Sequence, residues 1–83
     1  MTQSDREFLD ELARLAAKAI PGPWTKEEMS NSGLGWLVRS QDGTVVSDFL
    51  SEETAEFIAR SRLAVPRLLW LIAEIEKEKR HGV

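Results

Sequence analysis

The chain has 83 residues, a formal net charge of −3 and no cysteine. Its length predicts a single domain over residues 1–83 with a thin core, because a chain this short buries only about 60% of its unfolded surface. The acidic balance argues against duplex-DNA binding, and the absence of cysteine excludes disulfides and thiolate metal sites. The longest apolar run, Leu68 to Ala73, is too short to cross a bilayer. The absence of cysteine fits a cytoplasmic protein, which is the location we expect.

The pattern over residues 5–20 predicts an amphipathic helix. Ser4 and Glu7 have the spacing of a capping box. Apolar residues from Phe8 onward then recur every three or four positions. Pro21 ends the helix, because a residue that precedes proline is pushed out of the α region.

The segment that follows this helix predicts a structural turn. We expect Gly22 to take the positive φ that helix ends often need, and Trp24 to fill a seam between the first helix and the later ones. Removal of the Trp24 side chain should therefore unfold the protein or dissolve its assembly. The residues given this structural role are Pro21, Gly22, Pro23, Trp24, Phe57 and Ile58.

Residues 35–49 predict a β-hairpin, since Asp42-Gly43 is a strong turn signal between two segments rich in β-branched and aromatic residues. A two-residue loop would place Val38 opposite Ser47, whereas a three-residue loop would shift this register. In the two-residue register, the core-like face carries Trp36, Val38, Val45 and Phe49.

The last third of the chain predicts two helices or one kinked helix. Ser51 is a good cap for a helix over residues 52–64. Pro66 either kinks this helix or begins a new one over residues 66–80, and a frayed tail follows at 81–83.

These elements define an α+β fold. A small antiparallel sheet, made of the hairpin and an edge strand over residues 24–29, packs against the N-terminal helix and the C-terminal helix pair. Residues 30–35 fit a loop. The final helix is apolar nearly all round, although a monomer needs only one apolar stripe, so we expect a homo-oligomer. The expected interface is Leu69, Trp70 and Leu71.

Two segments near the ends of the chain share a recognisable pattern. Residues 15–24 read LAAKAIPGPW, and residues 55–77 read AEFIARSRLAVPRLLWLIAEIEK. Together they resemble the lambdoid Ead-type early-region proteins of phages and prophages. This chain departs from the pattern in three places: Ile20 replaces a usual threonine, Ser61 replaces an alanine, and Trp70 lies within the last helix. The matching residues are Pro21, Gly22, Pro23, Trp24, Ala55, Phe57, Ile58, Ala59, Arg62, Val65, Pro66, Leu68, Leu69, Ile75 and Glu76.

This resemblance implies a phage-encoded accessory protein that is made in the host cytoplasm. It brings no defined molecular activity with it. Phage accessory proteins of this size are often inhibitors of host functions or defences, which is an association rather than a physical argument.

Catalytic groups are sparse in the sequence. His81 is the one histidine, and without a second histidine or a cysteine neither zinc binding nor Cys/His catalysis is supported. The adjacent acids Glu27-Glu28 and Glu52-Glu53 fit an exposed strand and a helix start rather than an acid/base couple. We therefore expect a protein that is not an enzyme and has no metal or cofactor.

A cluster of arginines is the strongest candidate for a binding site. Arg60, Arg62 and Arg67 fall within eight residues that contain no acid. A guanidinium suits phosphate, and the first turn of a helix also attracts anions. In the structural interpretation, Arg60 and Arg62 lie near a helix C-terminus, where cations are favoured, or Arg62 is buried against an acid such as Asp48. This structural interpretation is the one we favour for the cluster.

Three functions follow from these patterns. The first is a homo-oligomer that sequesters a small anionic, nucleotide-type defence signal near Arg39, Arg60, Arg62 and Arg67, with Trp36 available for stacking. The second is an inhibitor or adaptor that binds a host protein through its apolar C-terminal helix. Nucleic-acid binding is the least favoured of the three, because the net charge is negative.

Overall fold

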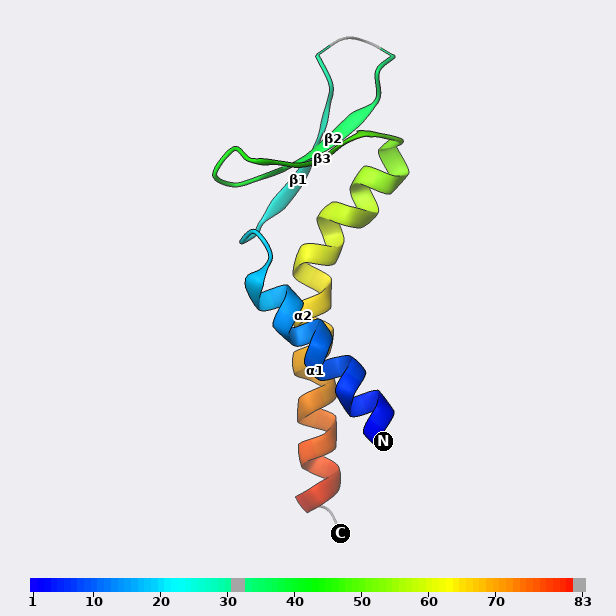
Figure 1. Ribbon diagram of the computed structural model, residues 1–83, viewed down its shortest axis with the longest axis vertical. Helices are drawn as coiled ribbons and strands as arrows, with labels where there is room; N and C mark the ends of the chain where they lie inside the picture. The colour runs from blue at the N-terminus through cyan, green and yellow to red at the C-terminus, as the bar shows by residue number, and fades with distance from the viewer. Residues whose placement is uncertain (31–32, 82–83) are drawn as a thin grey trace. The chain divides into compact units, whose positions relative to one another are not determined.

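The computed structural model describes residues 1–30 and 33–81, with side chains as far as Lys79. Residues 31–32, in the predicted loop, and 82–83, in the predicted tail, lie outside the described residues. The arrangement confirms the α+β class. In chain order the elements are α1 (Gln3–Lys18), β1 (Trp24–Glu28), β2 (Trp36–Ser40), β3 (Val45–Leu50) and α2 (Glu52–His81) (Figure 1).

The chain forms two compact units. One unit comprises Met1–Ala19 with Ala64–Val83, and the other comprises Ile20–Leu63. The division falls within α2, between Leu63 and Ala64. The first part of this helix belongs to the unit that contains the sheet, and the second part belongs to the unit that contains α1. Among the described helices, none is both long and apolar enough to cross a membrane.

Helix α1 begins two residues earlier than the predicted range 5–20. The capping box is formed by Thr2 and Asp5, not by Ser4 and Glu7: the Asp5 amide donates to Thr2 Oγ1 at 3.1 Å, and the Thr2 amide donates to the Asp5 carboxylate at 3.4 Å. A threonine followed three residues later by an acid has the same cap geometry as the predicted pair. The chain therefore uses the first of two overlapping cap signals.

The sheet has three antiparallel strands in the order β1-β2-β3, so β1 is an edge strand as predicted. Strand β1 pairs with β2 in a regular register, with Lys26 opposite Val38. The charged residues of β1 suit this position, since an exposed charge on an edge strand discourages pairing with another sheet.

The β2–β3 hairpin has a three-residue loop and an irregular register. The Ser40 amide donates to the Thr44 carbonyl at 2.9 Å, so Ser40 pairs with Thr44. The loop therefore consists of Gln41, Asp42 and Gly43, and not of Asp42 and Gly43 alone. Val38 lies opposite Ser47 as the two-residue register predicted, but only because the register shifts between Arg39 and Val38. A second shift follows before Trp36.

Two residues of the predicted core face are exposed. Strand β3 has one extra residue between Ser47 and Leu50. As a result Leu50, and not the predicted Phe49, lies opposite Trp36. Phe49 adopts a φ of 56° and its side chain is 66% exposed. Val45 is 44% exposed. The bulge turns Phe49 out of the alternating pattern, so the expected burial of Phe49 and Val45 was wrong.

The core of the sheet unit is small. Val38 is completely buried, and Leu37 and Ala55 are the other buried apolar residues of the described chain. Ser40 is a buried polar residue and its hydroxyl donates to the Asp42 carboxylate. Strand β2, whose consecutive residues Leu37 and Val38 point to opposite faces, and the start of α2 thus supply the core.

Helix α2 runs without a break from Glu52 to His81. Of the two predicted alternatives, the structure therefore has a single helix through Pro66 and no boundary at 64–66, and the helix includes residue 81, where the tail was predicted to begin. The Thr54 amide donates to Ser51 Oγ at 3.2 Å, which confirms the predicted cap. Pro66 lies inside the helix. Proline removes one helical hydrogen bond, but strong helix formers on both sides favour continuation.

In the unit that contains α1, this helix lies beside the second half of α2 (Figure 1). An Arg6 nitrogen lies 3.9 Å from the Glu76 carboxylate. The two helices border a groove of about 400 Å³, with Leu9 on one side and Ile72 on the other. No residue of α1 is fully buried.

Candidate anion-binding site

A cleft of about 530 Å³ lies in the sheet unit, between the segment that enters β1 and one face of α2. The turn before β1 and the strand itself form one wall, and successive turns of the helix form the other. The residues that line the cleft include Trp24, Lys26, Glu56, Ala59, Arg60 and Arg62.

The turn before β1 is fixed by two donors that share one backbone carbonyl. The indole nitrogen of Trp24 donates to the Ile20 carbonyl at 3.0 Å, and Arg62 Nε donates to the same oxygen at 2.9 Å. The Arg62 guanidinium also lies over the Trp24 ring, with its carbon 5.8 Å from the ring centre. The aromatic ring and the carbonyl together restrain the arginine.

Gly22 has a different role from the expected one. It does not have a positive φ. A Cβ atom at residue 22 would instead stand 2.9 Å from Arg62 Cγ and 3.7 Å from the Trp24 amide nitrogen. Glycine is needed here because the Arg62 side chain passes directly over the backbone.

The charge of Arg62 has no carboxylate partner among the described residues. None of the salt bridges in the described part of the chain includes it, and Asp48, the expected partner, is exposed. Nε is used by the Ile20 carbonyl, which leaves the two terminal nitrogens as donors on a half-buried side chain. Arg62 therefore carries a positioned positive charge with no carboxylate of the described chain within 4.0 Å.

The other cations of the cleft are paired with acids. Lys26 Nζ lies 2.8 Å from Glu56 and 3.0 Å from Glu52, and Arg60 Nε lies 2.6 Å from Glu56. Hydrogen bonds from Lys26, and then from Arg60, lower the pKa of Glu56, so this carboxyl stays ionised near neutral pH. Glu56, and then Glu52, raise the pKa of Lys26.

The structure brings together only part of the predicted ligand set. Arg60 and Arg62 both line the cleft. Arg39 is on β2, where it bonds to Glu27 and to the Gly43 carbonyl, both at 2.9 Å. Trp36 lies under Lys26 Nζ, 5.2 Å from the ring centre, and does not line the cleft. Arg67 belongs to the other unit.

Sequence reasoning missed two parts of the site. Lys26 lies in a strand whose charges were assigned to edge protection, and the Ile20 carbonyl is a backbone atom with no signature of its own. The spacing of Glu56 and Arg60, four residues apart on a helix, is the signal that would have shown Arg60 to be paired. In the described part of the chain, no group of three or more acids or histidines is placed to hold a metal ion.

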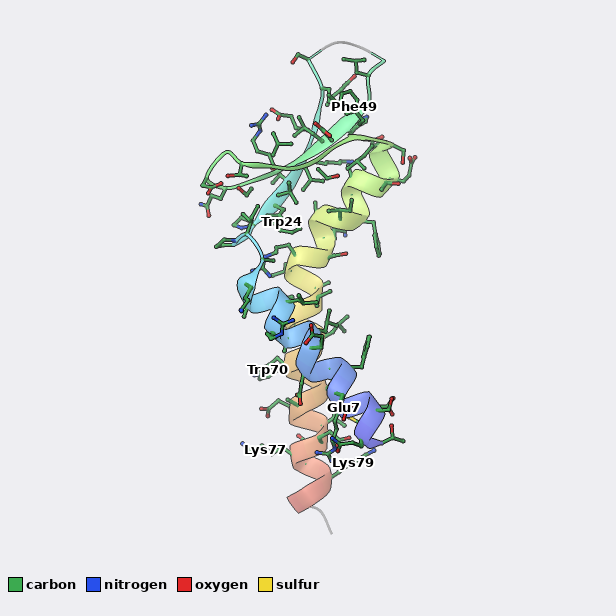
Figure 2. The ribbon with its side chains drawn as sticks, viewed as in Figure 1. Glu7, Trp24, Phe49, Trp70, Lys77 and Lys79 are labelled. Carbon is green, nitrogen blue, oxygen red and sulfur yellow. The ribbon has the colours of Figure 1, made fainter. Side chains whose placement is uncertain are left out.

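The residues assigned to an interface differ in exposure. Leu69 is half-buried and borders the groove beside α1, whereas Leu71 is exposed. Trp70 is 61% exposed and projects outward from α2 (Figure 2). Phe57, assigned a structural role, is an exposed residue, while Ile58 is half-buried.

No protein-family model, no curated protein and no solved structure matches this chain. The Ead-type resemblance consequently stays a prediction.

Proposed function

We propose that the protein binds a small anionic ligand in the cleft beside β1 and acts by retaining it, without chemical transformation. The observation that carries this proposal is Arg62, a restrained and half-buried guanidinium without a carboxylate partner among the described residues. Holding such a charge in place costs free energy unless an anion compensates for it.

The surroundings of Arg62 define the ligand class. Its two terminal nitrogens offer the geometry that phosphate oxygens accept. Trp24, Ala59 and Leu63 add apolar and aromatic surface to the same cleft. A phosphate group joined to a flat or apolar part, as in a nucleotide, would satisfy both features. The cleft volume is in the range of pockets that hold small molecules.

A binding role fits the acidic group of the cleft better than catalysis does. Glu56 accepts from two cations, and its lowered pKa makes it a poor proton donor near neutral pH. Taken with the Ead-type resemblance, sequestration of a nucleotide-type defence signal is the role that we propose in a phage-infected cell. The proposal of a phage source rests on that resemblance alone.

Titration calorimetry with a panel of cyclic nucleotides and ADP-ribose, and with inorganic phosphate as a simpler probe, tests this function. We expect at least one nucleotide to bind, and Arg62→Gln to weaken its binding roughly 10- to 100-fold, as expected for the loss of charge-assisted hydrogen bonds. Arg62→Lys should recover only part of the affinity, because lysine lacks the planar fork.

Arg14→Gln is the matched control, since it removes one arginine that does not line the cleft. It should leave nucleotide affinity unchanged. If no member of the panel binds, or if Arg14→Gln weakens binding as much as Arg62→Gln does, the proposal is wrong.

A second candidate function is an inhibitor or adaptor that binds a host protein. The observation that favours it is Trp70, because a tryptophan with this exposure on a helix is a typical interface anchor. Retention of a host protein by the wild type, together with its loss in Trp70→Ala, would support this function. Retention that is unaffected by Trp70→Ala would count against it.

A further inference from the structure

The second half of α2 carries an exposed apolar seam, formed by Ala64, Leu68, Leu71 and Ile75. The spacing of these residues alternates between four and three. All four are exposed, and the three larger side chains are between 38% and 56% exposed. The seam is distinct from the side of α2 that borders the groove beside α1, which carries Leu69.

This spacing indicates which kind of partner the seam would accept. Apolar residues that alternate by three and four positions repeat every 3.5 residues on average, which is the pattern that packs against another helix. The seam spans 12 residues, from Ala64 to Ile75, and Glu78 occupies its next position. A sheet or an irregular segment would not match this period, so the spacing favours a helix as the partner.

The charges that flank the seam favour a second copy of the same helix. Arg67 and Glu74 precede Leu68 and Ile75 respectively, so they occupy equivalent positions, one heptad apart, on one side of the seam. In an antiparallel pair, Leu68 packs near Leu71 of the partner subunit. Arg67 then faces Glu74 of the partner subunit, and two-fold symmetry makes this ion pair twice.

A parallel pair would be less well matched. In a parallel pair, a residue on the side of the seam that carries Arg67 and Glu74 faces the residue five positions further along the partner helix. Glu74 would then meet Lys79 of the partner subunit. Arg67 would meet Ile72 of the partner subunit and would gain no ion pair there. Antiparallel packing also sets the helix dipoles in opposition, which is the favourable arrangement.

We propose that α2 forms an antiparallel homodimer through the seam Ala64, Leu68, Leu71 and Ile75, with Arg67 and Glu74 as reciprocal ion pairs across it. This inference goes beyond ligand binding and does not depend on the anion cleft. It replaces the expected interface of Leu69, Trp70 and Leu71, because Leu69 borders the groove beside α1 and Trp70 lies off the seam.

Light scattering after size exclusion measures the self-association directly. The full chain should have about twice its monomer mass of 9.4 kDa at micromolar concentration. Leu71→Glu should give the monomer mass, because it buries a charge at the centre of the seam. Circular dichroism should show an unchanged helix content, since Leu71 is exposed in the single chain. Trp70→Gln, on the same helix but off the seam, should remain dimeric.

Charge reversal tests the orientation. Arg67→Glu alone and Glu74→Arg alone should each weaken dimerisation roughly tenfold, because attraction becomes repulsion at two places. The double variant Arg67→Glu/Glu74→Arg should recover the wild-type dimer. In a parallel dimer, Arg67→Glu would have little effect and the double variant would stay weakened. That result, a monomeric wild type, or a dimer broken by Trp70→Gln and not by Leu71→Glu would overturn the proposal.

Discussion

Gly22 lies directly against the Arg62 side chain, so that a Cβ atom at residue 22 would stand 2.9 Å from Arg62 Cγ. Gly22→Ala should therefore push the guanidinium away from the Ile20 carbonyl and from the Trp24 ring. We expect a loss of about 1–3 kcal/mol in the free energy of unfolding, the usual cost of overpacking a close contact. Urea unfolding measures this, and nucleotide affinity should fall in the same variant.

A double-mutant cycle can show whether the loss of stability in Gly22→Ala comes from the contact with Arg62 or from alanine at residue 22 in general. In an Arg62→Ala background, the clash is removed, so Gly22→Ala should cost much less than it does in the wild type. A double-mutant cycle measures that coupling. Equal costs in the two backgrounds would show that Arg62 is not the reason for glycine at this position.

Val38 and Val45 provide a matched comparison of burial within one hairpin. Val38 is fully buried, so Val38→Ala should lower the free energy of unfolding by about 2 kcal/mol, from lost burial and the cavity left behind. Val45→Ala should cost less than half as much. Similar losses in the two variants would mean that the core is not centred on Val38.

Phe49 is held in a backbone conformation that suits asparagine better than phenylalanine. Its φ of 56° costs a non-glycine residue about 1 kcal/mol, and its exposed ring recovers little of this by burial. Phe49→Asn should be more stable than Phe49→Ala, because asparagine tolerates this region while alanine keeps the strain. Thermal unfolding of the two variants makes the comparison, and a less stable Phe49→Asn would argue against strain at this residue.

The sequence predicted the kinds and order of the elements well, because periodicity and turn chemistry are local. It was less successful where local signals compete. Thr2 and Ser4 both begin good capping boxes, and nothing nearby decides between them. Pro66 is compatible with a break, a kink or a continuous helix, and the outcome depends on the residues around it.

The candidate site was only partly predictable for a different reason. Arg62 was singled out by its place in a cluster of arginines, but its partner is the Ile20 carbonyl, 42 residues away. A backbone acceptor leaves no mark in a sequence. The bulge that exposes Phe49 also has no signature in the sequence, because its extra residue follows from the pairing of two strands rather than from either strand alone.

The pairing of Glu56 with Lys26 and Arg60 predicts a loss of stability in acid. The pKa of the Glu56 carboxyl is lowered in the folded chain, first by Lys26 and then by Arg60, from its ordinary value of 4.5. A lowered carboxyl pKa contributes stability that is present above the unfolded value and is lost as the pH falls through the folded value. The contribution should therefore be constant near neutral pH and disappear progressively below pH 4.5.

Glu56→Gln removes this contribution at neutral pH, so the variant should lose less stability than the wild type between neutral pH and a pH well below 4.5. Glu53→Gln is the matched control, since Glu53 makes no ion pair with the described residues. Urea unfolding at the two pH values gives the comparison. Glu56→Gln should also strengthen anion binding, because it leaves Lys26 and Arg60 without their shared carboxylate. Equal pH dependence in Glu56→Gln and the wild type would show that this pairing contributes nothing to folding.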